Sequence, residues 1–192
     1  MAEQSGDGAR TRARIIASAR IQVLLSGEAA TSSGRVAAEV KVSKALVHYH
    51  FAEKRDLLKA VASACSEAIR SRQETSLGAA PGGSVIDEHR EWLIGELDAR
   101  DLETLIQLMR SHDADIAAAA TRGVRTFRSM MASRVSKVLT TLELPLVIRT
   151  DLVTDLMATA VIGLASSGRA ERESDARAII DTLWLAVLRL TR

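Results

Sequence analysis

The amino-acid sequence predicts an all-α protein of about nine helices, arranged as a small N-terminal unit followed by a larger C-terminal bundle. Apolar residues make up 47% of the 192 residues, and proline, which interrupts helices, occurs only 2 times. Apolar residues recur every three or four positions along most of the chain, whereas no segment of useful length alternates as a β-strand does. The core must therefore be built from helix faces.

Two helices are predicted before residue 41. The first covers Ala9–Ser26, where apolar residues lie at helical spacing, and Gly27 is well suited to end it. Residues 1–8 are small and polar, and we expect them to form a disordered tail. A hydroxyl in the stretch 31–33 can cap a second, short helix. The apolar positions of that helix are Val36, Ala37 and Val40.

Two further helices are predicted before residue 74. Ser43 can cap a third helix that ends near His50, after a tight turn at residues 40–43. A fourth helix starts at Glu53 and ends near Gln73, and it connects the two parts of the chain. Its apolar stripe is formed by Leu57, Leu58, Val61 and Ala64.

The second part of the chain is predicted to form a helical bundle. Gly, Pro and Ser without periodicity at Ser76–Ser84 mark a break before it. Beyond the break, periodicity indicates a helix at Val85–Asp98 and then an apolar stripe of Leu102, Leu105, Ile106 and Met109. A long helix follows from about Asp113 to Leu142, and Pro145 opens another that runs to about Ser167. A last helix is indicated at Ala176–Arg189, after the polar stretch 166–175.

Charge is unevenly distributed along the chain. The formal net charge is only +2, but residues 1–72 contain 12 Lys and Arg against 7 Asp and Glu, and the remainder is mildly acidic. A basic first third joined to an acidic remainder favours a polyanionic partner for the first third alone.

Several protein classes are excluded by composition. The single cysteine, Cys65, rules out an intramolecular disulfide and is interpreted as a packing residue. The chain does not open on a secretory leader, and its longest uncharged apolar run, Leu156–Ala165, is too short to cross a bilayer. We therefore expect a cytoplasmic protein with no membrane partner.

An enzyme is not expected either. The sequence contains no nucleophile elbow, no Gly-rich phosphate loop, no HExxH zinc motif and no clear acid–base pair, so no cofactor is predicted. His48 and His50 lie two positions apart, which points them to different faces of a helix rather than to one metal ion. His112, Asp113 and Asp115 are interpreted as a solvated helix cap. No metal site is predicted.

The stretch KVSKALVHYHFAEKRDLL, Lys41–Leu58, carries the strongest functional signal. The second and third helices and the turn between them have the spacing of a helix-turn-helix, whose last helix enters the DNA major groove. Val47 and Phe51 lie four residues apart and would face the core. The outward positions are then Lys44, Leu46, His48 and Tyr49. Ser43, Lys44 and Lys54 lie at helix N-termini, where backbone N–H groups attract phosphate.

A wider segment, TSSGRVAAEVKVSKALVHYHFAEKRDLL at Thr31–Leu58, closely resembles the signature of the tetracycline-repressor (TetR) family of bacterial transcription regulators. With helix one included, the resemblance covers about the first third of the chain. It implies a DNA-binding domain at 9–54, a C-terminal ligand-binding and dimerisation domain at 55–192, and a homodimer on double-stranded operator DNA. By position, it implies phosphate contacts for Ser33, Tyr49, His50 and Lys54, and positions near base edges for Lys44, Ala45 and His48. Arg35, Ser43 and Leu46 complete the predicted DNA-binding surface.

The sequence departs from the family pattern at three positions. Lys41 stands where the family usually has Gly in the turn, at a position that tends to need a positive φ and that costs a non-Gly residue about 1 kcal/mol. Ala45 replaces a common Gly, and its methyl could contact a thymine methyl. His48 replaces a common Tyr. These departures concern the preferred DNA sequence rather than the fold.

Met and aromatic residues of the C-terminal part are the candidates for an effector pocket. Their helical spacing is typical of an ordinary core, but Met also suits a cavity that accepts irregular ligands. The predicted ligand-binding residues are Trp92, Met109, Phe127, Met130, Met131 and Met157. Polar groups of the pocket are expected from Arg110, His112, Arg125 and Arg128, which predicts a mainly apolar small-molecule effector with one or two hydrogen-bonding ends.

The last two predicted helices, Pro145–Ser167 and Ala176–Arg189, each carry more apolar surface than one inward stripe needs. We therefore expect a homodimer through these helices, with Gly163 allowing close approach. The function predicted for the whole chain is a repressor released by its effector. One alternative is a DNA-binding regulator whose C-terminal domain senses a protein or no ligand, and a second, least favoured, is an all-α enzyme.

Overall fold

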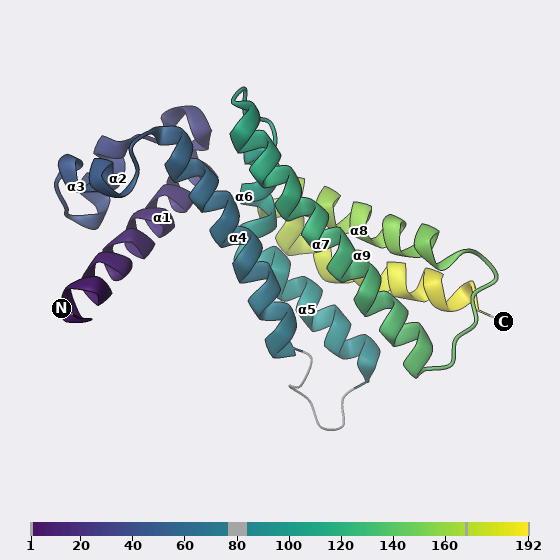
Figure 1. Cartoon of the computed structure of the whole chain (residues 1–192). Coiled ribbons are helices and arrows are strands. Elements are labelled where there is room, and N and C mark those ends of the chain that lie inside the picture. The colour runs from purple at the N-terminus through teal and green to yellow at the C-terminus, as the bar shows by residue number, and fades with distance from the viewer. Residues whose placement is uncertain (1, 77–83, 168, 192) are drawn as a thin grey trace. The chain divides into compact units, whose positions relative to one another are not determined.

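The computed structural model describes residues 2–76, 84–167 and 169–191. Within these residues it contains nine helices and no strand beyond an isolated β-bridge between Leu146 and Thr191, so the predicted all-α fold is confirmed (Figure 1). The helices are α1 (Ala2–Ala30), α2 (Ser33–Val40), α3 (Lys44–His50), α4 (Lys54–Ser76), α5 (Val85–Ala99), α6 (Asp101–Leu108), α7 (Ala114–Thr141), α8 (Thr150–Ser166) and α9 (Arg169–Arg189). Most of the predicted break at Ser76–Ser84 lies outside the described residues. None of the helices in the described ranges has the length and apolar character needed to span a bilayer.

Contacts divide the chain into two compact units. The first consists of the residues up to Cys65 together with Thr104–Gly123, and the second consists of Ser66–Glu103 and Val124–Arg192. Helices α4, α6 and α7 each run from one unit into the other. These units are a different division from the predicted domains at 9–54 and 55–192, because residues 104–123 group with the N-terminal helices.

Two helices begin earlier than the sequence predicted. α1 begins at Ala2, so residues 2–8 continue the helix instead of forming a disordered tail. Ala, Glu and Gln at positions 2–4 are strong helix formers, and extending an existing helix avoids the cost of nucleating one. α9 begins at Arg169 rather than Ala176 for the same reason, since its first residues are Arg, Ala and Glu. Gly27 breaks α1 as expected, with φ 80° and ψ 169°, although a short helical segment continues to Ala30.

The start of α8 is also different from the prediction. Pro145 does not open this helix, which begins at Thr150. The intervening chain is tied to the C-terminal segment, because the Val147 N–H donates to the Leu190 carbonyl at 2.8 Å, beside the bridge between Leu146 and Thr191. A long-range contact with the C-terminal segment therefore overrides the local signal of proline.

The first three helices form a helix-turn-helix unit within the first compact unit, where α1, α2 and α3 contact one another (Figure 1). Two serines define its helix starts. The Ser32 hydroxyl accepts from the Arg35 N–H at 3.3 Å, and the Ser43 hydroxyl accepts from the Leu46 N–H at 3.1 Å. The fully buried side chains of this unit are Ile15, Ala19, Val23, Val36 and Val47.

The turn between α2 and α3 confirms the positive φ expected at Lys41. Its backbone adopts φ 55° and ψ 51°, the left-handed conformation. The Lys41 and Val42 N–H groups donate to the Ala38 and Ala37 carbonyls at 3.3 and 3.0 Å, which caps the end of α2 as in a Schellman motif. A lysine therefore occupies a position where its Cβ crowds the following carbonyl.

Relieving this strain should stabilise the protein. We expect Lys41→Gly to raise the free energy of unfolding by about 0.5–1 kcal/mol, since Gly adopts the left-handed conformation without steric cost. Lys41→Ala is the matched control, because it removes the same charge but keeps the Cβ. Urea unfolding of both variants measures the effect, and equal stability of the two would show that the turn stores no strain.

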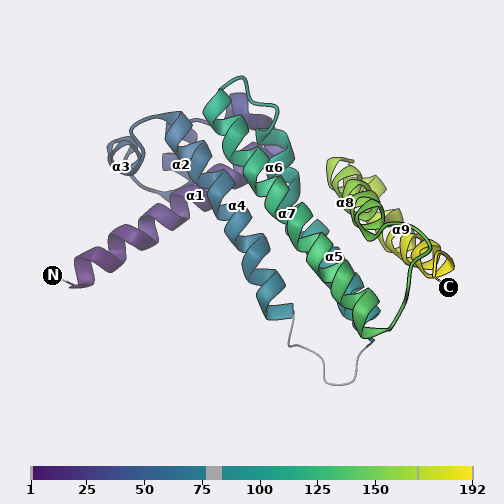
Figure 2. The same cartoon turned by 45° about the vertical axis from the view of Figure 1, so that its right-hand side comes forward.

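In the second compact unit, α5, α8 and α9 pack against one another. Figure 2 shows α8 and α9 side by side. A buried ionic network lies in the same unit. The Arg72 guanidinium donates from Nε and Nη2 to the two carboxylate oxygens of Glu96 at 3.0 and 2.8 Å, and its Nη1 lies 2.9 Å from Asp101. The Glu96 side chain is 0% exposed and that of Asp101 only 5%. Burial raises the pKa of the Glu96 carboxyl, and the hydrogen bonds and charge of Arg72 oppose that rise.

Candidate functional site

Helix α3 has one side that faces the protein core and one side that faces solvent. Val47 is fully buried and Phe51, which ends the helix, is almost so. The five outward side chains of Lys44, Ala45, Leu46, His48 and Tyr49 are all exposed. Tyr49 is 82% exposed, an unusual position for the only tyrosine of the chain, and its ring meets the His50 ring edge-on at 5.3 Å. The structure therefore brings the predicted recognition residues together on one solvent-facing surface.

The remaining predicted contacts come from the ends of α2 and α3. Ser33 is partly buried at the start of α2, and the neighbouring Ser32 provides the cap. Arg35 is exposed, and its guanidinium donates to the Ala30 carbonyl at 3.0 Å. Ser43 uses its oxygen to cap α3, which leaves its hydroxyl hydrogen able to donate to a phosphate.

Lys54 has a partner inside the protein. Its ammonium donates to the Glu28 carbonyl at 2.6 Å and to the Ala29 carbonyl at 3.3 Å. These carbonyls belong to the last turn of α1, where backbone oxygens lack helical partners and attract a cation. Lys54 thus ties the start of α4 to the end of α1, and its contact with a phosphate stays a prediction.

Two arginines of α1 have structural contacts that the sequence did not reveal. Arg14 donates to the Val40 carbonyl at the end of α2 at 2.7 Å, and Arg12 lies over the Phe51 ring with its Cζ 4.9 Å from the centroid. Both hold α1 against the helix-turn-helix.

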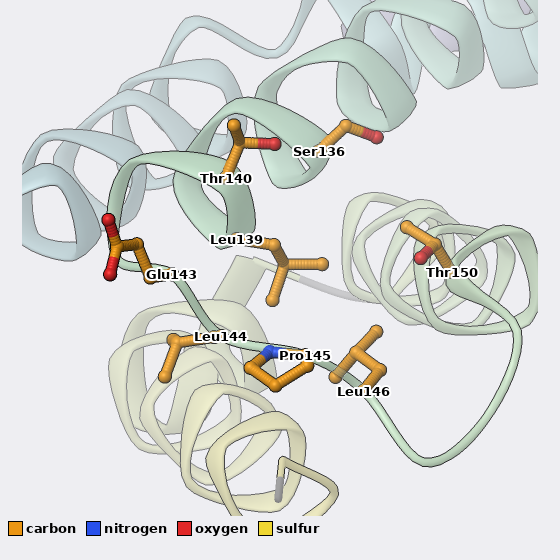
Figure 3. Close-up of a pocket in the computed structure, with 8 residues that line it drawn as sticks. All are labelled: Ser136, Leu139, Thr140, Glu143, Leu144, Pro145, Leu146 and Thr150. Atoms are coloured by element: carbon orange, nitrogen blue, oxygen red, sulfur yellow. The ribbon is translucent and has the colours of Figure 1, made fainter.

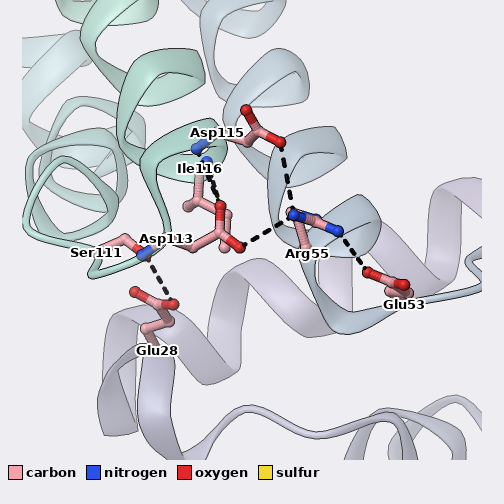
Figure 4. A network of polar contacts seen from close by, with 7 residues as sticks. All are labelled: Glu28, Glu53, Arg55, Ser111, Asp113, Asp115 and Ile116. Atoms are coloured by element: carbon pink, nitrogen blue, oxygen red, sulfur yellow. Dashed lines mark hydrogen bonds and ion pairs between the residues drawn. The ribbon is translucent and has the colours of Figure 1, made fainter.

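A polar network joins α1, α4 and the segment before α7 within the first compact unit (Figure 4). The Ser111 hydroxyl donates to Glu28 at 2.9 Å, and the Arg55 guanidinium lies 3.8 Å from Asp113 and 3.7 Å from Asp115. Asp113 also accepts from the Asp115 N–H at 2.9 Å and caps α7, which confirms the predicted helix cap.

Five of the six predicted ligand-binding residues are buried in the second compact unit. These are Trp92, Phe127, Met130, Met131 and Met157. The Trp92 and Phe127 rings stack with centroids 5.9 Å apart and planes inclined by 24°. Met109 is different: it lies in the turn after α6 and is 38% exposed, because that helix ends at Leu108.

The polar groups expected beside the pocket lie at the surface. Arg110, His112 and Arg125 are exposed, and Arg128 reaches the Thr159 hydroxyl at 3.4 Å. The polar side chains that do line the Trp92 cluster are others, which the sequence analysis missed. They are His89, whose ring centroid lies 5.6 Å from that of Trp92, and Arg134, whose Cζ lies 4.6 Å from the Trp92 centroid.

A separate hollow of about 640 Å³ opens where α7 ends and the chain turns toward α8 (Figure 3). Leu139, Leu144, Pro145 and Leu146 give it an apolar side, with hydroxyls from Ser136, Thr140 and Thr150 around them. None of the six predicted ligand-binding residues lines this hollow. It is therefore distinct from the aromatic and Met cluster.

Comparison with known proteins agrees with this arrangement. Residues 15–61 match the family described as bacterial regulatory proteins, tetR family. That range includes α2, α3, the turn between them and the start of α4. Among curated proteins, none matches the chain in sequence.

Solved structures share the fold along nearly the whole chain. A TetR-family transcriptional regulator from Agrobacterium tumefaciens matches 96% of this chain and 100% of its own, with a TM-score of 0.77 and 15% identity. A transcriptional regulator from Rhodococcus sp. Rha1 matches 94% and 97%, with a TM-score of 0.70 and 15% identity. The regulator FadR from Bacillus subtilis, in complex with stearoyl-CoA, matches 91% and 96%, with a TM-score of 0.65 and 13% identity.

Three observations are consistent with DNA binding by the N-terminal helices. They are the helix-turn-helix geometry, the exposed outward side of α3 and the family match. Residues 15–61 are therefore a helix-turn-helix region of the type found in bacterial regulatory proteins of the tetR family, and nearly the whole chain shares the fold of solved TetR-family structures.

Proposed function

We propose that this chain is a repressor: a homodimer binds operator DNA through α2 and α3, and a small effector held in the C-terminal core releases it. The observation that carries the DNA-binding part is α3 itself. Its inward side is fixed by the buried Val47, while the side chains of Lys44, His48 and Tyr49 are exposed to solvent. Side chains that are exposed on a rigid helix are suited to reading a groove.

Charge and hydrogen-bond donors support this assignment. Lys44 and the Ser43 hydroxyl lie at the N-terminus of α3, where the helix dipole also favours a phosphate. His48 and Ala45 lie on the outward side, so they are the residues that we assign to base edges. We keep 9–54 as the DNA-binding domain and 55–192 as the effector and dimerisation domain.

The proposed dimer interface is formed by α8 and α9. On α8, Leu152 and Leu156 are 56% and 59% exposed, and on α9 Leu185 is 64% exposed. Gly163 continues the Leu152 and Leu156 side of α8, and a Cβ added there would meet no atom within 4 Å. Apolar residues left exposed along neighbouring helices, beside a glycine with open space, fit a twofold interface between identical helix pairs.

The effector part rests on the buried aromatic and Met cluster. Met side chains adapt to irregular ligands, and the FadR neighbour contains a bound acyl-CoA in its structure. For an effector to release DNA, it must bind better to the dimer whose α3 helices are wrongly spaced for successive major grooves.

The role of Lys44 tests the DNA-binding part. We expect Lys44→Ala to weaken DNA binding and to reduce by about 0.9 the slope of log affinity against log salt, which is the value for one lost phosphate contact. Lys137→Ala removes an exposed lysine of α7 and serves as the control. Anisotropy titrations at several salt concentrations measure both slopes. If the Lys44 variant has the same affinity and salt slope as the control, Lys44 does not contact DNA phosphate.

A further inference from the structure

His89 presents a buried hydrogen-bond donor that no group in the described protein accepts. Its side chain on α5 is 1% exposed, and the Trp184 indole N–H donates to its Nδ1 at 3.2 Å. Burial, with a smaller contribution from the nearby Arg134 charge, lowers the pKa of His89 to about 3, so the ring is neutral at physiological pH. Because Nδ1 accepts, the proton must lie on Nε2, and this N–H has no partner.

The His89 ring borders a small cavity that is also lined by the positively charged side chain of Arg134. The cavity has a volume of about 20 Å³ and is lined by Val85, Glu88, His89, Arg134, Lys137 and Val138. Arg134 is 6% exposed; its guanidinium stacks on Trp92 and reaches the Gln73 carbonyl at 3.5 Å. The space holds one water molecule or the head group of a ligand whose body displaces neighbouring side chains.

We propose that this cavity binds the carboxylate of an acidic effector, with the Arg134 guanidinium and the His89 Nε2–H as its donors. The inference rests on the proposed effector response and adds the chemical class of the ligand. The partnerless buried N–H of His89 calls for an acceptor, and a cation beside it favours an acceptor with negative charge. Apolar residues around Trp92, above all Phe127, would then contact the body of the ligand.

The acidic residue among those that line the cavity, Glu88, makes the inference specific. Glu88 is partly exposed, and its charge already acts on Arg134, so an entering carboxylate must compete with it. Removing the Glu88 charge should therefore strengthen binding of an acid. It should leave a neutral ligand unaffected and weaken binding of a cation.

The chain carries its own reporter for this site. It contains only 2 tryptophans, and the ring centroids of Trp92 and Trp184 lie 5.6 and 5.1 Å from that of His89. All tryptophan fluorescence therefore comes from residues next to the cavity, and occupation of the cavity should change it.

The experiment titrates the full-length protein with hexanoate and with hexanamide, its neutral analogue, and follows tryptophan emission. We expect hexanoate to give a saturable change and hexanamide to bind at least tenfold more weakly. Arg134→Met should weaken hexanoate binding at least tenfold, whereas Arg125→Met, an exposed arginine on the same helix, should not. Glu88→Gln should strengthen it about threefold, and this variant tests the site even where Arg134→Met fails to fold.

Any of three results would overturn the inference and leave the cavity with water only. They are equal affinity for hexanoate and hexanamide, an unchanged hexanoate affinity in Glu88→Gln, and no emission change with either compound. A parallel operator-binding assay separates this result from the proposed function. Hexanoate that binds as expected without releasing DNA supports the carboxylate site and contradicts effector-controlled release. Release by hexanoate without any emission change contradicts the carboxylate site alone.

Discussion

Arg72→Ala should lower the free energy of unfolding by about 3–5 kcal/mol, because it removes the guanidinium that pairs with two buried carboxylates, those of Glu96 and Asp101. Arg70→Ala is the matched control. Arg70 lies two residues away on α4 and pairs with Glu67 at the surface, where an ion pair contributes less than about 1 kcal/mol. Urea unfolding measures both variants.

The Arg72 effect should also depend on pH. Burial already raises the pKa of Glu96, and loss of Arg72 raises it further, so the folded state of the variant binds a proton more readily than the unfolded chain does. A raised carboxyl pKa means that stability falls as pH rises from the unfolded to the folded value. The deficit against wild type should therefore be larger at pH 7 than at pH 5. A deficit equal to that of the Arg70 variant would show that the network contributes little.

Leu156→Arg should convert the dimer to a monomer and weaken operator binding at least a hundredfold. The substitution places a charge in the centre of the proposed α8 interface, and a monomer can contact only one of two half-sites. Sedimentation velocity at micromolar concentration and operator anisotropy measure the two effects. Leu25→Arg, on an exposed leucine of α1, is the control for oligomeric state and should remain dimeric. A wild-type monomer under these conditions would contradict the interface.

Local sequence signals predicted much of the DNA-binding unit. The Ser43 cap and the left-handed Lys41 depend on a few neighbouring residues, so turn and capping chemistry was enough to place them. The start of α8 and the contact of Lys54 depend on segments far away in the chain, the C-terminal residues and the end of α1. Periodicity contains no information about such partners.

The sequence analysis missed the buried polar side chains of His89 and Arg134 for a related reason. His89 lies between Glu88 and Arg90, and charged neighbours usually indicate a solvated helix face. Its spacing of three from the buried Trp92 was the one available sign that it faces inward. Arg134 gave no such sign, because a buried arginine depends on the aromatic surface that covers it.

The most direct test of the account compares specific with non-specific DNA binding. A labelled fragment from upstream of the gene is bound by the full-length protein and displaced by unlabelled competitors, either the same fragment or random DNA of equal length, at physiological salt. The account predicts that the upstream fragment competes at least about 10³-fold better than random DNA. It also predicts that His48→Ala changes the ranking of mutated fragments while Lys137→Ala does not. Equal competition by the two DNAs would contradict sequence-specific recognition by α3.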